Sequence, residues 1–112
     1  MKDVIEESKK LNENIHNSEE YKKYIDTRKK LYDNMELCNQ LKEFRRRNYE
    51  LQNRQGVNPY DEVLGLVLEY DELLHNSLVS DFLRAEQHIC RMMQKVYSSI
   101  SEGLEFDYLD EQ

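Results

Sequence analysis

The stretch VLGLVLEYDELL, residues 63–74, carries more apolar side chains than a surface helix needs. A surface helix usually shows one apolar stripe, with polar side chains on the opposite side. In this stretch, Val and Leu cover nearly every direction around the helix axis. They stand at Val63, Leu64, Leu66, Val67 and Leu68. We therefore expect a helix that is buried on more than one side.

Two arrangements can bury such a helix. A chain of 112 residues has few helices available to surround another one, so a contact between subunits is one solution. The centre of a monomeric helical bundle is the other, and the pattern alone leaves both open. The predicted oligomer or partner contact consists of Val63, Leu66, Val67, Tyr70, Leu73 and Leu74.

Gly65 lies in the interior of the same helix. Glycine at such a position costs about 1 kcal/mol relative to alanine, because its backbone loses more freedom on folding. A close approach of a second helix can offset that cost. We therefore expect a tight helix crossing at Gly65.

The tripeptide His-Asn-Ser occurs twice, at residues 16–18 and 75–77. Histidine suits a helix C-terminus, where positive charge is stabilised, and Asn or Ser can accept hydrogen bonds from the free amides of the next helix. Both copies therefore predict a helix break. After the first copy, Asn17 and Glu20 also have the spacing of a capping box.

Apolar residues at three- and four-residue spacing predict the helices on either side of these breaks. The expected helices run from Val4 to His16, from Tyr21 to Asp33, from Leu37 to about Gly56, from Asn58 to about Leu74, and from Val79 to Gly103. Asn58 and Pro59 suit a helix start, since Asn can cap free amides and Pro fits the first turn. Gly103 suits a helix end, because glycine can adopt the left-handed conformation, with Leu104 folding back as its apolar partner.

Composition agrees with a helical chain. It contains three Gly and one Pro, and 35% of its residues are charged, so helix breakers are scarce and helix formers abound. We expect an all-α fold, an antiparallel bundle of about five helices with long helical hairpins, which associates into oligomers. Residues 1–103 are expected to form one helical domain, and residues 104–112 a loose acidic tail.

Charge and hydropathy bear on partners and location. Residues 1–56 carry 13 Lys and Arg against 11 Asp and Glu, whereas residues 57–112 carry 3 against 12, which gives +2 and −9. The net charge of −7 argues against general nucleic-acid binding, and the two opposite signs favour docking of complementary surfaces. There is no run of 18 apolar residues and no hydrophobic N-terminal segment, so we expect a cytoplasmic protein without membrane contact.

The chain offers no pattern typical of an enzyme or a metal site. It has no glycine-rich phosphate loop, no Ser-His-Asp pattern and no evident acid–base pair. Glu86 and Cys90 stand one helical turn apart, but His88 points elsewhere on a helix and no CxxC or HExxH supplies further ligands. We expect no enzymatic activity, metal or cofactor, with Cys90 a reduced thiol and Cys38 a small packing residue.

Lys42, Arg45, Arg46 and Arg47 form the one basic cluster. Three consecutive arginines fan over about 200° of a helix, so they cannot all line one narrow groove. Solvent exposure or pairing with acidic groups of another subunit is the favoured interpretation. RNA contact through these four residues, in an accessory factor of mRNA processing, is the alternative.

Four segments resemble the YlbF/YmcA family of small all-helical bacterial regulatory proteins. They are NSEEYKKY at 17–24, LKEFRRRNYELQ at 41–52, HNSLVSDFLRAEQHI at 75–89 and GLEFDY at 103–108. The resemblance implies a helical, oligomeric, non-enzymatic protein linked to competence, sporulation and biofilm control. Some family members form a three-protein complex that assists an endoribonuclease in mRNA processing, so the resemblance implies such a complex among the partners. Members of that complex resemble iron–sulfur proteins in carrying cysteines near the C-terminus, whereas residues 104–112 contain none.

The leading hypothesis is therefore a cytoplasmic regulatory adaptor. It is expected to self-associate through the helix at residues 63–74 and to bind other regulatory proteins.

Overall fold

The computed structural model describes residues 1–54 and 59–106. Within these residues the chain forms six helices and no strand, which confirms the all-α fold class. The helices are α1 (Lys2–His16), α2 (Glu19–Tyr32), α3 (Met35–Gln52), α4 (Pro59–Glu69), α5 (Asp71–His75) and α6 (Ser77–Ser101).

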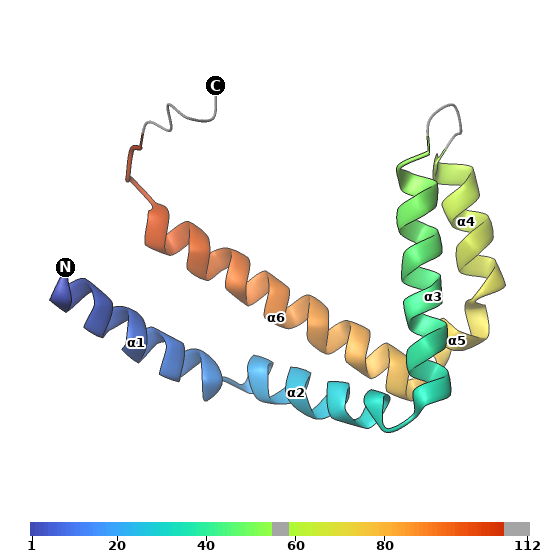
Figure 1. Ribbon diagram of the computed structural model, residues 1–112, viewed down its shortest axis with the longest axis horizontal. Coiled ribbons are helices and arrows are strands. Elements are labelled where there is room, and N and C mark those ends of the chain that lie inside the picture. The colour runs from blue at the N-terminus through green and yellow to red at the C-terminus, as the bar shows by residue number, and fades with distance from the viewer. Residues whose placement is uncertain (55–58, 107–112) are drawn as a thin grey trace.

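The helices form two arms that meet at a corner (Figure 1). In one arm α2 runs antiparallel to α6, and α1 continues from α2 away from the corner, on the same side as the far end of α6. In the other arm α3 runs antiparallel to α4. The Cα radius of gyration is 18.8 Å, well above the roughly 13 Å of a closely packed domain of this length. The two arms therefore extend away from each other, and the helices do not pack around one common axis.

Both His-Asn-Ser copies are helix breaks, as predicted. The ring Nδ1–H of His16 donates to the backbone oxygen of Asn12 (2.9 Å), and that of His75 donates to the oxygen of Asp71 (2.8 Å). Each histidine thus adds a side-chain hydrogen bond to the carbonyl group four residues earlier in its own helix. In the second copy Asn76 then caps α6, because its side-chain oxygen accepts from the amides of Leu78 (3.0 Å) and Val79 (3.4 Å).

The first copy differs from the expected capping box. Ser18 caps α2 by accepting from the backbone N–H of Tyr21 (3.2 Å). Asn17 instead closes α1, since its backbone N–H donates to the oxygen of Glu13 (3.1 Å). The prediction of an Asn17–Glu20 box was wrong, because Asn17 is the C-cap of α1 and the N-cap of α2 is the next residue, Ser18.

The expected fourth helix is two helices. It starts at Pro59 as predicted, but the backbone leaves the helical conformation at Tyr70 (φ −102°, ψ 23°), and α5 begins at Asp71. This break redirects the chain at the corner and brings Leu73 into the core. The third helix ends at Gln52; Gly56 and Asn58, expected as its end and as the next cap, lie outside the described residues.

The C-terminus of α6 follows the expected pattern in part. Gly103 adopts the left-handed conformation (φ 78°), and the Leu104 amide bonds to the oxygen of Ser101 (3.1 Å). The side chain of Leu104 is exposed, so it does not fold back onto the helix as an apolar partner.

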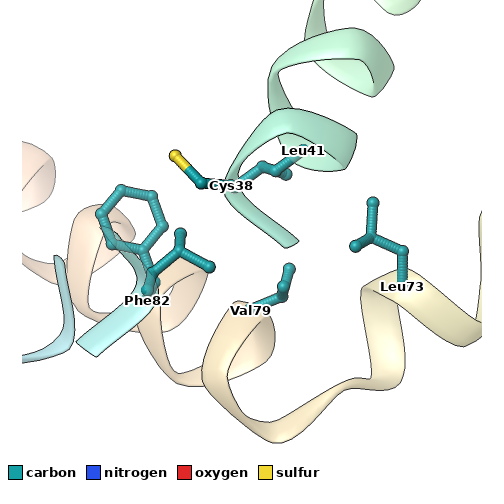
Figure 2. Close-up of a cluster of buried hydrophobic side chains, with 6 residues drawn as sticks. Cys38, Leu41, Leu73, Val79 and Phe82 are labelled. Carbon is teal, nitrogen blue, oxygen red and sulfur yellow. The ribbon is translucent and has the colours of Figure 1, made fainter. Parts of the chain in front are cut away.

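The main core cluster lies at the corner, where α2, α3, α5 and α6 meet (Figure 2). It consists of Leu31, Cys38, Leu41, Leu73, Val79 and Phe82. Val79 is 0% exposed, and the Phe82 ring packs against Tyr24 with 5.7 Å between ring centroids. Cys38 is a buried packing residue of this cluster, as predicted.

Candidate protein-interaction surface

Helix α4 buries one side against its own chain and exposes the other. Leu66 is 3% exposed and points into the α3–α4 arm, whereas Leu64 is 52% exposed and Leu68 is 67% exposed. We call the outward cluster of Tyr60, Leu64, Val67 and Leu68 the α4 face. An open groove runs along its edge, lined by Gln52 of α3 together with Tyr60, Val63, Leu64 and Val67.

The predicted contact residues divide between the core and the surface. Leu66 and Leu73 are buried within the chain itself, so they were wrongly expected to be available to a partner. Val63, Tyr70 and Leu74 are half-buried, and Val67 is 37% exposed. The exposed residues that the prediction omitted are Tyr60, Leu64 and Leu68. Their four-residue spacing at 60, 64 and 68 marks them as a single stripe of the helix.

Helix α4 is not the centre of a single-chain bundle. It contacts α3 along its length and α5 at its end, and its other sides lie on the outside of the arm (Figure 1). Burial on more than one side, expected from the sequence, is therefore not reached within one chain.

Gly65 does not mark a tight helix crossing. Apart from its two chain neighbours and the adjacent backbone of its own helix, no described atom lies within 4 Å of the position that a Cβ at Gly65 would occupy. The glycine lies on the polar side of α4, beside a cleft lined by charged residues such as Arg47, Glu62 and Glu69. Polar side chains there leave space above the helix, which is why the expected close approach is absent.

The arginines of the basic cluster diverge toward separate carboxylates. Arg45 donates to Glu86 of α6 (2.5 Å), and Arg47 donates to Glu69 of α4 (3.0 Å). Arg46 pairs with Glu43 and Glu50 of its own helix. The prediction that they do not line one groove is confirmed. Two of the pairs, Arg45–Glu86 and Arg47–Glu69, also join the basic half of the chain to its acidic half. Acidic residues of the same chain therefore neutralise part of the basic cluster.

Aromatic rings extend two of these contacts. The Arg45 guanidinium lies 5.6 Å from the centroid of the Phe82 ring, and Lys42 Nζ lies 6.0 Å from that of Tyr32. The Tyr70 hydroxyl accepts a second hydrogen bond from Arg47 (3.2 Å). All four residues predicted as a basic patch thus have partners within the chain.

The family is decided by comparison with known sequences. A family model described as "Control of competence regulator ComK, YlbF/YmcA" matches residues 4–105, from the first turn of α1 to beyond the end of α6. The chain belongs to the YlbF/YmcA family. The comparison with curated proteins finds no match, and neither does the comparison with solved structures.

The ion pairs of this YlbF/YmcA protein shift the titration of their members. The hydrogen bond from Arg47 holds the pKa of Glu69 below its ordinary value, and that from Arg46 does the same to the pKa of Glu43. Both carboxylates also raise the pKa of their arginine partners. Because these pairs lie in solvent, screening limits what they contribute to stability.

The residues considered as metal ligands do not gather in this family member. Glu86 is engaged by Arg45, while His88 and Cys90 lie exposed on α6. Across residues 1–54 and 59–106, no three His, Cys, Asp or Glu side chains are placed to hold a metal ion. Among the helices that the structure describes, none is long and apolar enough to cross a membrane.

Proposed function

We propose that this YlbF/YmcA protein is a non-enzymatic cytoplasmic regulatory adaptor that self-associates through the α4 face and binds other regulatory proteins. The observation that carries the proposal is the exposed apolar cluster of Tyr60, Leu64, Val67 and Leu68 on a helix whose opposite side is already packed. Apolar residues gathered in one exposed patch are typical of interaction sites, whereas scattered ones are ordinary.

The composition of the α4 face suits a contact between identical surfaces. Its apolar side chains are bordered by polar ones, Gln52 at the groove and Glu69 beyond Leu68. An apolar centre with a polar rim is the usual anatomy of a protein interface, and tyrosine is common among the residues that dominate binding. A two-fold contact brings the same patch from both copies together, so one helix face supplies both sides.

The regulatory part of the proposal rests on the family. The matching family model describes a control-of-competence regulator, which supports an action on other regulatory proteins. The partners proposed are such proteins, including those of an endoribonuclease-associated complex that the family resemblance implies. RNA contact gains no support, because the charges of Arg45, Arg46 and Arg47 are already offset by carboxylates.

The test is a double substitution on the α4 face, Leu64→Asp with Val67→Asp. A charge without a partner in an apolar contact costs several kcal/mol, so the variant should lose the contact through the α4 face and form smaller species while keeping its helix content. Light scattering and circular dichroism on the same sample measure both. Met35→Asp is the matched control, since Met35 is also exposed but lies at the start of α3.

The regulatory role is tested in the native cell. A strain without the wild-type gene should regain its normal competence-gene transcript levels with the wild-type protein or Met35→Asp. It should not regain them with the α4 double variant at equal protein level. A double variant that retains the wild-type mass contradicts self-association through α4. A double variant that dissociates but restores normal transcript levels contradicts a role of the α4 contact in regulation.

A further inference from the structure

A second apolar region lies at the opposite end of the molecule from α4. All of α1 is described, and none of its side chains is buried. The far part of α6 is also poorly covered: Tyr97 is 64% exposed and Ile100 is 58% exposed. We call this region the open end; its apolar residues are Val4, Ile5, Leu11 and Ile15 of α1 and Met93, Val96, Tyr97 and Ile100 of α6.

The geometry of the arm explains why the open end stays uncovered. Helix α6 has 25 residues, about 37 Å, whereas α2 has 14 residues, about 21 Å, so α2 covers little more than half of α6. Beyond α2 the chain offers α1, but α1 lies apart from α6 (Figure 1). Among the described residues, α1 makes only a small contact, with the neighbouring helix α2. A 15-residue helix is marginal in water without tertiary packing, so α1 needs a further partner.

The accessible surface indicates how much of the chain remains to be covered. It measures 9314 Å², whereas a monomeric protein of 13.6 kDa exposes about 6,600 Å². The excess is roughly 2,700 Å², and a standard contact removes about 800 Å² from each partner. Pairing through the α4 face alone thus leaves more than half of the excess, enough for a second contact of standard size.

Charge favours a second copy of the same chain as the occupant. Helix α1 carries four carboxylates and three lysines, with Glu7 and Lys10 paired at 3.1 Å. Residues 87–101 of α6 carry Arg91 and Lys95 and no carboxylate. Helix α1 of one copy therefore complements α6 of another, whereas two α6 helices side by side would repel each other. A two-fold axis supplies this α1–α6 pairing twice.

We propose that the open ends of two copies pack together, with α1 of each copy against α6 of the other in a four-helix arrangement. The apolar residues of the open end run from Val4 to Ile15 in α1 and from Met93 to Ile100 in α6. This contact is independent of the α4 face. Because the two contacts use different surfaces, together they join more than two copies, and each alone gives a dimer.

The experiment combines two sets of substitutions. Val4→Asp with Ile100→Asp places charge at the open end, and Leu64→Asp with Val67→Asp disrupts the α4 face; native mass spectrometry counts the copies. We expect at least four copies for the wild type, two for either double variant and one for the combined variant. Ser98→Asp, an exposed residue on the opposite side of α6, is the control and should retain the wild-type mass.

The two proposals can fail separately in this experiment. An open-end variant with the wild-type mass overturns the open-end contact between copies. The same result is expected if that surface binds an unrelated protein instead. An α4 variant with the wild-type mass overturns the α4 contact and leaves the open-end proposal standing. Circular dichroism verifies folding of each variant; Val4 is 69% exposed in the first turn of α1, where an acidic residue is well tolerated. If the Val4→Asp, Ile100→Asp variant loses its helix content, Tyr97→Lys alone provides the mass measurement, with the same two outcomes.

Discussion

The corner of the molecule and the ends of its arms use apolar side chains in opposite ways. At the corner four helices converge and enclose Leu31, Val79 and their neighbours almost completely. On α4 and at the open end, residues of the same types stay exposed, such as Leu68 and Ile100. The apolar content of a helix therefore does not determine whether it is packed in one chain; the number of neighbouring helices does.

The difference separates folding from assembly. Substitutions at the corner remove contacts within the chain, so they should change the free energy of unfolding. Substitutions on the exposed faces leave those contacts in place and should change the number of associated copies. Substitutions at the two kinds of position test this division directly.

Phe82→Ala should cause the largest loss of stability. The ring is buried at the corner, packs against Tyr24 and lies beneath the guanidinium of Arg45, so its removal leaves a cavity and ends both contacts. The expected cost is about 3–5 kcal/mol, a large share of the roughly 5–15 kcal/mol that holds a small domain together. Urea unfolding followed by circular dichroism measures it.

The control for Phe82→Ala is Tyr49→Ala, which removes an exposed ring from α3. It should change the unfolding free energy by no more than about 0.5 kcal/mol. Both proteins are measured at one concentration, because association stabilises the folded state. Similar losses for the two variants would contradict the placement of the core at the corner.

Asn76→Ala should cost about 1 kcal/mol, because two amides at the start of α6 lose their side-chain acceptor. Asn17 occupies the equivalent place in the other His-Asn-Ser copy, yet it closes α1 through its backbone. Asn17→Ala should therefore have little effect on thermal or urea unfolding. Equal costs at the two positions would show that both asparagines cap in solution.

The helices were predictable from the sequence because caps and apolar spacing act locally. Each His-Asn-Ser copy signals its own break, and Pro59 signals the start of α4. The break at Tyr70 was not predictable in this way, since tyrosine is an ordinary helix residue and the chain turns there to bring Leu73 into the core. The position of that turn depends on the packing of Leu73 with residues of α3 and α6 in the core cluster.

The candidate surface was predictable only in outline. Periodicity gives the direction of each side chain around its own helix, but not which direction faces the neighbouring helix. Leu64 and Leu66 are the same residue type on the same helix, yet Leu64 is exposed and Leu66 is buried inside the α3–α4 arm. The same limit applies to Gly65, whose neighbours in space are charged residues of α3 and α4.

Gly65→Ala should have a small effect on stability and none on association, which distinguishes the polar side of α4 from its apolar side. Apart from its two chain neighbours and the adjacent backbone of its own helix, the added methyl group meets no described atom within 4 Å. Alanine should therefore stabilise the fold by about 0.5–1 kcal/mol by restricting the unfolded chain. Gly65 lies on the polar side of α4, away from Leu64 and Val67, so the number of associated copies should not change. Urea unfolding and light scattering on one sample report both quantities. Loss of association would mean that another helix passes closely over Gly65 in the assembly. The subunit contact would then lie on the polar side of α4, and the proposal of an apolar contact would be wrong.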